Sequence, residues 1–347
     1  MIPSAAAGRG DRPLNALAAG SAAEPAAGPA SHAPHRLRSR RSAASRAGFL
    51  LLLAVSLLAG ACSAVKLGYE NLPLVVGWQA DRYLSLDDDQ EALVSRHAKL
   101  LQRWHRRSLL PVYADFLRQV EEELGNPVTA GQVAGWRQRV VSAWLPLAEQ
   151  AAPAVAEVAV TLRPEQLAHL QKALVRANAK SDAEYRPPDP AKREQARYAR
   201  LVERAESLLG DTTSAQKELM RNSAAAMARS EDAWWRARLA RQKAVVDLLT
   251  ELAAEKPPAA EATRRARVVL AGLFSHHDSK SASSAVPASG APESTDHRAL
   301  RLTVERASEA GDDLTAGLLA LATPEQRRNA VKRLDSYRQD FNLLAAR

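Results

Sequence analysis

Hydrophobic side chains recur every three or four residues from about residue 85 to the end of the chain, which is the spacing of one face of an α-helix. Leu93, Leu100, Leu101 and Trp104 show this spacing in the first such segment. After Cys62 no segment has the alternation of a strand, and no Asn-Gly or Asp-Gly pair indicates a hairpin turn. The pattern predicts an all-α fold, an antiparallel multi-helix bundle of about eight or nine helices with short loops.

Cap residues divide this pattern into separate helices. Ser85 is expected to cap the first helix, ahead of aspartates that suit the positive end of the helix dipole. Thr129 and Gln132 have capping-box spacing, and Pro146 and Pro153 are expected to kink or break the helix that follows. That helix is expected to turn Val133, Trp136, Val140 and Trp144 inward. Other helices are expected to begin at Pro111, Pro164, Pro190 and Thr213 and to cover about 260–274, 296–322 and 324–346.

Three of the expected helix starts share a similar sequence that ends in glutamine. They are residues 162–166, 212–216 and 322–326. Their spacings of about 50 and 110 residues are too uneven for a solenoid repeat. We interpret them as independent helix starts. The second opens a long helix that is expected to run to about Glu255 and to bend near Ser230.

Cys62 is the only cysteine in the chain, and it follows an apolar stretch and a run of small residues. A basic flank (36–46) and about 11 apolar residues (48–58) precede it. This order resembles the lipobox of bacterial lipoproteins, which implies cleavage before Cys62 and a diacylglycerol on its thiol. The apolar stretch is shorter than the roughly 20 residues of a membrane-spanning helix. A short membrane anchor and a buried core cysteine are the alternatives.

These features divide the chain into two parts. Residues 1–61 are expected to be a disordered extension followed by the signal peptide. Residues 62–347 are expected to form one helical lipoprotein domain, with a disordered insert at about 275–294. Ser63 occupies the position where aspartate retains enterobacterial lipoproteins at the inner membrane. We therefore expect a lipid-anchored protein of the outer membrane that faces the periplasm.

The net charge of the whole chain is +9, but much of this excess lies in the signal region. Seven of the 48 Lys and Arg residues and two of the 39 Asp and Glu residues lie in residues 1–61, so the processed chain has a net charge of +4. A nucleic-acid partner is therefore not expected. Once Cys62 is acylated, no cysteine is left for a disulfide, a zinc site or catalysis.

Distinctive motifs after Cys62 are Tyr69-Glu70-Asn71-Leu72-Pro73, Trp78, Trp104-His105-Arg106-Arg107, Trp234-Trp235 and Thr323-Pro324-Glu325-Gln326. Together they resemble a family of proteobacterial lipoproteins known only as a domain of unknown function, over nearly all of residues 62–347. The resemblance implies a lipid anchor and a helical fold, without catalytic residues or a cofactor. The Thr-Pro-Glu-Gln helix start is also similar to motifs of periplasmic stress proteins of the Spy and CpxP type, which implies ATP-independent binding of unfolded clients.

Arginine and tryptophan are interleaved on three of the expected helices, one of which carries Trp136, Arg137 and Arg139. The other two carry the candidate residues Arg103, Trp104 and Arg107, and Trp234, Trp235 and Arg238. Such faces bind phosphate-rich surfaces by charge and stacking, here the head groups of phospholipid or lipopolysaccharide. We therefore take these six residues as a candidate binding face. The alternative is a pair of ordinary helices with indole rings inward and guanidinium groups in water.

No arrangement of residues predicts catalysis, a metal site or a cofactor. The sequence has no Gly-x-Ser-x-Gly, no phosphate-binding glycine loop and no His-Glu-x-x-His. His97 is expected to be a hydrogen-bonded core residue, and the adjacent His276 and His277 are too few for a dedicated metal site. We expect a non-enzymatic binding or structural role with an envelope protein partner. The alternative is a chaperone for unfolded clients.

Overall fold

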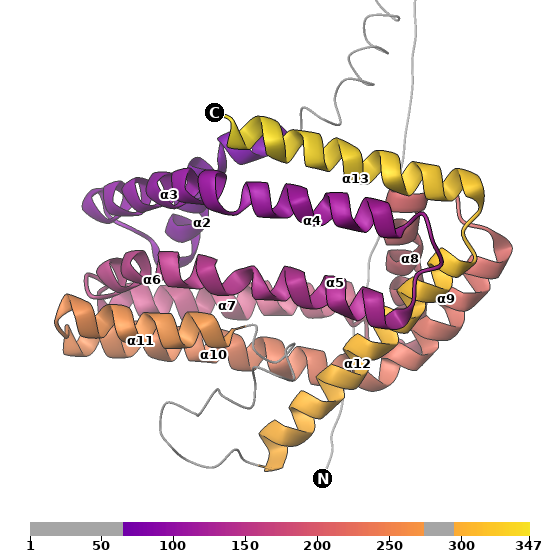
Figure 1. Cartoon of the computed structure of the whole chain (residues 1–347). Helices are drawn as coiled ribbons and strands as arrows, with labels where there is room; N and C mark the ends of the chain where they lie inside the picture. Colours follow the sequence, from indigo (N-terminus) through magenta and orange to yellow (C-terminus); the bar gives the residue numbers. More distant parts are fainter. Residues whose placement is uncertain (1–64, 274–294) are drawn as a thin grey trace, which may run out of the picture. The chain divides into compact units, whose positions relative to one another are not determined.

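The computed structural model describes residues 65–273 and 295–347, and all regular structure in these ranges is helical, which confirms the all-α class (Figure 1). Cys62 and the insert expected at 275–294 lie outside the described residues. Residues 65–70 are helical. The helices that follow are α2 (Leu72–Leu84), α3 (Asp88–Ser108), α4 (Leu110–Glu123), α5 (Ala130–Ser142), α6 (Trp144–Ala159), α7 (Pro164–Tyr185), α8 (Pro190–Leu209), α9 (Ser214–Met227), the 3-10 turn η1 (Ala228–Ser230), α10 (Glu231–Glu255), α11 (Ala259–Gly272), α12 (Thr295–Ala320) and α13 (Pro324–Ala345).

The helices are more numerous than the eight or nine expected. One reason is that residues 72–84 form α2, a helix that the sequence pattern did not predict. Another is that the long helix expected from residue 213 to 255 is divided into α9 and α10 by η1. At this turn the Ser230 hydroxyl donates to the Met227 carbonyl (3.0 Å), which competes with the helical pairing of the backbone.

The helix expected after Thr129 is also divided, but the division lies at Ala143 and not at a proline. Pro146 lies in the first turn of α6, where its missing N–H costs no helical hydrogen bond. The helix continues through Pro153, so the break expected there does not occur.

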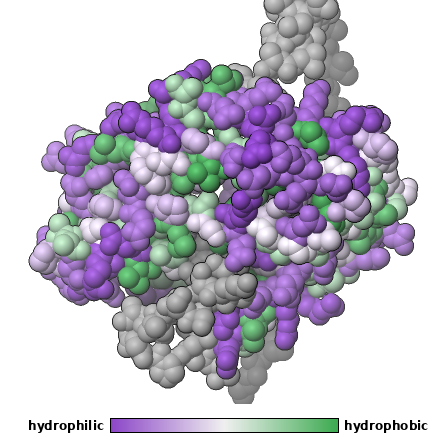
Figure 2. Space-filling model, viewed as in Figure 1, coloured by the Kyte–Doolittle hydropathy of each residue, from purple (hydrophilic) through white to green (hydrophobic). Residues whose placement is uncertain are grey.

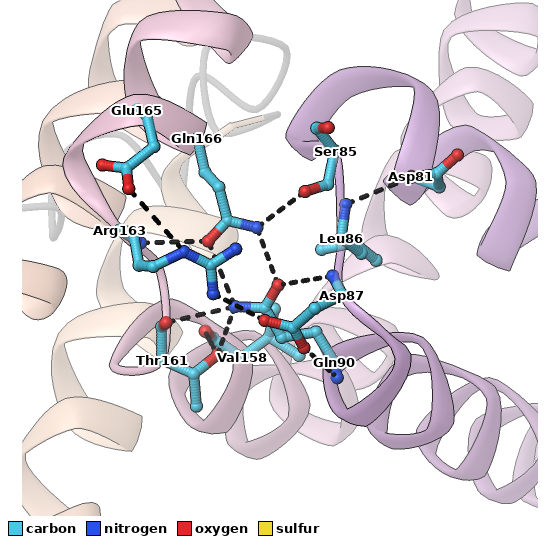
Figure 3. Close-up of polar contacts among 10 residues, drawn as sticks. All are labelled: Asp81, Ser85, Leu86, Asp87, Gln90, Val158, Thr161, Arg163, Glu165 and Gln166. Carbon is cyan, nitrogen blue, oxygen red and sulfur yellow. Dashed lines mark hydrogen bonds and ion pairs between the residues drawn. The ribbon is translucent and has the colours of Figure 1, made fainter.

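Asp87, and not Ser85, is the N-cap of α3. The Asp87 carboxylate accepts the backbone N–H of Gln90 (3.0 Å), whereas Ser85 ends α2 in the left-handed conformation with φ of 51°. Arg163 at the start of α7 donates to the same carboxylate (2.5 Å) and holds the pKa of Asp87 below its ordinary value. The first turn of α3 is thus tied to the start of α7 (Figure 3).

The largest hydrophobic cluster lies between α6, α10 and α11. Ala148, Ala152 and Ala156 form a stripe along α6, and Ala262 and Ala266 belong to α11; all five are at most 2% exposed. Small side chains on both helices allow their backbones to approach closely. This explains why α11 lies along α6 over most of its length (Figure 1).

Two buried glutamines from distant parts of the chain bond to each other where α3 and α7 begin (Figure 3). Gln90 Nε2 donates to Gln166 Oε1 (3.2 Å), and Gln166 Nε2 donates to Gln90 Oε1 (2.7 Å). The same nitrogens donate to loop carbonyls, from Gln90 to Thr161 (3.1 Å) and from Gln166 to Ser85 (2.9 Å). Each Oε1 also accepts the N–H of its own N-cap residue. The pair therefore ties two helix N-termini to the two loops that precede them.

The same network occurs a second time, where α9 and α13 begin. Gln216 and Gln326 donate to each other at 3.1 and 2.9 Å, and their Nε2 atoms also donate to the carbonyls of Leu318 (3.2 Å) and Asp211 (2.7 Å). Helices α2, α3, α6 and α7 surround the first network as α8, α9, α12 and α13 surround the second. The three similar helix starts are therefore not independent. They are three of the four positions in a structural repeat, and Gln90 occupies the fourth.

The structural repeat divides the helices into two halves, 72–185 and 190–345. The middle helices of each half, α4 and α5 in the first and α10 and α11 in the second, pack against helices of the other half. Helix α4 lies along α13, and α11 lies along α6 (Figure 1). Helix α5 packs against α12 as well. This exchange brings α4, α5, α12 and α13 together, and a cavity lies among them.

Candidate functional site

A cavity of about 830 Å³ lies between α4, α5, α12 and α13, and most of its wall is apolar. This volume is within the range of small-molecule pockets. Phe116 comes from α4 and Leu334 from α13. The four side chains that the sequence predicts to point inward, Val133, Trp136, Val140 and Trp144, all line this cavity. Val133 is also part of a buried cluster against which Trp136 packs, and Trp144 packs against the cluster of α6 and α11, so these three point inward as expected, whereas Val140 is exposed.

A second cavity of about 770 Å³ adjoins the first and lies between α4 and α5, with Phe341 of α13 at its wall. On the face drawn in Figure 2, hydrophobic side chains (green) interrupt a largely hydrophilic surface (purple). Because the two cavities share wall residues, we treat them as one apolar cleft. The shared residues are Tyr113, Phe116, Leu117, Val140 and Ala143.

One ion pair lies in the wall of the apolar cleft and joins α5 to α12. Arg137 donates to the Asp312 carboxylate from Nε (3.0 Å) and from Nη2 (2.8 Å). The Asp312 side chain is 7% exposed, and its hydrogen bond raises the pKa of Arg137 above the ordinary value. The cleft thus combines an extended apolar wall with one fixed charge pair. Such a lining suits a ligand with an apolar body and few polar groups.

The sequence matches the model of a family of unknown function, DUF6279, over residues 82–266, which is more than half of the chain. This chain belongs to DUF6279. The expected relationship to a domain of unknown function is thereby confirmed, although the DUF6279 match is shorter than the 62–347 anticipated. No curated protein and no solved structure matches the chain.

The DUF6279 match includes Gln90, Gln166 and Gln216 but ends before Gln326. It likewise includes the α4 and α5 walls of the apolar cleft and not the α12 and α13 walls. The features of the lipoprotein signal lie outside the matched residues.

On α3 of this DUF6279 protein, the candidate binding face is partly open to solvent. Arg103 and Arg107 are exposed, and Trp104 between them is half-buried. Helix α3 packs against α2, α4, α6 and α13, whereas α10 packs against α6, α7, α11 and α12. The two groups of the candidate face therefore lie on helices with largely different neighbours.

On α10 the two adjacent tryptophans have different surroundings. Trp234 lines the apolar cleft. Two guanidinium groups lie over the ring of Trp235, with the Cζ atoms of Arg186 and Arg238 at 5.2 and 5.6 Å from the ring centre. These cation–π contacts use the ring within the protein. Binding of phosphate-rich surfaces by this face stays a prediction.

The other candidates from the sequence are polar residues with structural partners, or lie outside the described ranges. His97 is half-buried, and its Nε2 lies 2.7 Å from the Glu157 carboxylate. Cys62, His276 and His277 lie outside the described residues. Within 65–273 and 295–347, no group of three or more His, Cys, Asp or Glu residues could hold a metal ion.

None of the helices in the described ranges is both long enough and apolar enough to cross a membrane.

Proposed function

We propose that this chain is a lipid-anchored antiparallel helical bundle of the cell envelope with a non-enzymatic binding role. Its anchor is a diacylglycerol on Cys62, which holds it at the outer membrane, facing the periplasm. Its binding site is the apolar cleft between α4, α5, α12 and α13. The observation that supports this role is the cleft itself, because an open cleft of about 830 Å³ with largely apolar walls exposes hydrophobic side chains that a ligand would bury.

The cleft favours an apolar or amphiphilic ligand, such as an acyl chain or the hydrophobic segment of a partner. Aromatic rings of α4, α5 and α13 supply the contact area, from Phe116, Trp136 and Phe341. The Arg137–Asp312 pair lies at one wall and can orient a polar end of the ligand. The arrangement therefore supports binding, and it supplies shape and apolar area more than charge.

Two glycines in the wall allow a sharp test of the cleft. A Cβ atom built on Gly135 or Gly311 meets nothing within 4 Å, so leucine at either position extends into the hollow. Leucine in a helix is also more favourable than glycine, by nearly 1 kcal/mol. Gly135→Leu and Gly311→Leu should therefore fill the cleft without loss of thermal stability. Gly131→Leu, at an exposed position of α5 outside the cleft, is the matched control.

The measurement is the titration of the purified protein with an apolar fluorescent probe whose emission rises in dry surroundings. We expect the two cleft variants to lose most of the probe binding and Gly131→Leu to retain it. Equal binding by all three variants would refute the cleft as the site, and unchanged melting temperatures would show that a loss of binding is not caused by unfolding.

The alternative function, ATP-independent binding of unfolded clients, would use the same apolar cleft, because unfolded chains present hydrophobic side chains. Suppression of the aggregation of an unfolded protein at a near-stoichiometric ratio, lost in Gly311→Leu, would support it. Probe binding without such suppression would reject it.

The anchor is tested separately. Cys62→Ser should abolish acyl labelling and move the protein to the soluble fraction. If the variant stays with the membrane, the apolar stretch at 48–58 is itself the anchor, and the lipidation proposal is wrong.

A further inference from the structure

The first described helices expose a group of hydrophobic side chains. Leu74 is 70% exposed and Trp78 is 60% exposed, and their spacing of four residues places them on one side of α2. Contiguous exposed hydrophobic groups mark sites of association with a protein or a membrane. Val75 borders this side of α2, and Leu74, Val75 and Trp78 are called the α2 face below; Leu72 and Val76 are exposed as well but point elsewhere around the helix.

The fold does not require this exposure, as the structural repeat shows. Helix α8 has the place in the second half that α2 has in the first, because each packs against the two helices of its glutamine pair. Within Pro190–Leu209 no large hydrophobic side chain is exposed. The exposed positions of α8 instead hold residues such as Lys192, Glu194, Glu203 and Arg204. The α2 face is therefore a property of α2 and not of its role in the repeat.

The position of the α2 face in the chain indicates what covers it. Cys62 precedes the first described residue by three positions, and a fully extended chain of that length spans at most about 11 Å. A diacylglycerol on Cys62 would hold residues 65–84 at the bilayer surface. We propose that the α2 face lies in the interface of the membrane that carries the anchor. This inference rests on the anchor proposed at Cys62.

The chemistry of the α2 face fits a lipid surface. Tryptophan is enriched at the interface between head groups and acyl chains, and short amphipathic helices lie there with their apolar side down. The exposed Arg82 has its guanidinium 5.5 Å from the ring centre of Trp78, so a positive charge that can attract anionic head groups lies beside the indole.

A second copy of the chain fits the α2 face less well than a bilayer. A helix of 13 residues is about 20 Å long and about 10 Å wide, so it offers about 200 Å² to a partner. A stable protein interface needs about 800 Å² from each side. A bilayer has no such threshold when a covalent lipid already holds the helix against it.

The test uses the full chain, acylated at Cys62 and reconstituted in vesicles of phosphatidylethanolamine and phosphatidylglycerol. A fraction of the lipid carries bromine on its acyl chains, which quenches any indole that reaches them. We expect quenching in the unaltered protein and the loss of most of it in Trp78→Phe. Trp235→Phe, which removes an indole that lies outside the apolar cleft and contacts Arg186 and Arg238, is the matched control and should retain it.

A second pair of variants keeps all six tryptophans. Leu74→Glu should reduce the quenching, whereas Val175→Glu, at a position of α7 that is 68% exposed, should not. Circular dichroism of both variants shows whether they are folded.

Flotation of the same vesicles reports the anchor independently. Protein that floats without quenching from Trp78 overturns the inference and leaves the anchor standing. A dimeric mass together with an unquenched Trp78 assigns the α2 face to a second copy and also overturns it. Failure of the full chain to float rejects both the anchor and the interfacial position of α2.

Discussion

The paired glutamines make a quantitative prediction, because removal of one side chain affects four hydrogen bonds at once. Gln326→Ala removes the two that its Nε2 donates, to Gln216 Oε1 and to the Asp211 carbonyl. It also removes the two that its Oε1 accepts, from Gln216 Nε2 and from the N–H of Thr323. Gln216 stays fully buried, with part of its hydrogen-bonding capacity unused. We therefore expect a loss of stability well beyond that of an ordinary helix cap.

The magnitude follows from the four bonds. Each contributes about 1 kcal/mol net, and the buried polar atoms left without a partner add to this cost. The mutation also releases the rotamer entropy of one glutamine, which returns about 1–2 kcal/mol. The free energy of unfolding should fall by about 3 kcal/mol. Gln132→Ala is the matched control, because Gln132 forms the same capping box with Thr129 but has no glutamine partner. It should cost about 1 kcal/mol or less.

The assay is urea denaturation of the two variants and the unaltered protein, followed by circular dichroism. A double-mutant cycle completes it: Gln216→Ala and Gln326→Ala together should cost less than the sum of the single changes, by about 1–2 kcal/mol. Equal losses for Gln326→Ala and Gln132→Ala, or strictly additive single effects, would refute the view that the pair acts as a unit.

Three further predictions concern other groups. Burial lowers the pKa of His105 below the ordinary value of 6.5, so near pH 6.5 the unfolded chain binds more protons than the folded chain and stability falls as the pH drops. His105→Gln should therefore flatten the pH dependence of the urea midpoint in this range, and an unchanged slope would contradict the reasoning. Asp312→Asn breaks the ion pair with Arg137 and should lower the free energy of unfolding, measured in urea, by about 2–4 kcal/mol. Asp115→Asn breaks an exposed ion pair with Arg118 and should lower it by less than about 1 kcal/mol. Gly210 has φ of 81°, which side chains rarely adopt, so Gly210→Ala should cost about 1–3 kcal/mol and lower the melting temperature; no change would contradict the strain.

The helices themselves are predictable from sequence, because their start signals are local. Thr213 with Gln216 and Thr323 with Gln326 form the capping boxes that their spacing predicts. The pairing of the two glutamines is not predictable in this way, since 110 positions separate them and a cap signal carries no information about a distant partner. The turn at Ala228–Ser230 lies where the sequence predicts a bend, whereas the break at Ala143 has no proline and no side-chain cap to signal it.

Hydrophobic periodicity does not predict the apolar cleft. The period identifies the side chains that share one face of a helix, but it does not show whether another helix fills the space in front of them. Val140 was expected inside and is 62% exposed, because it lines the cleft. Leu100 was expected inside as well and is 46% exposed. The α2 face escaped prediction because residues 72–78 form a continuous apolar run, which lacks the three-to-four-residue period of an amphipathic helix.

The exchange of middle helices between the two halves has a consequence for how the chain reaches its final state. Helix α4 ends at Glu123, but the helix along which it lies, α13, begins at Pro324, so their contact closes a loop of about 200 residues. Contacts between such distant segments form late and slow the folding of a chain. A protein delivered from its N-terminus would expose the apolar side of α4 until its last helix arrives. Delivery of the C-terminal 24 residues is thus the event that completes assembly, and a chain that stops before residue 324 would leave α4 uncovered.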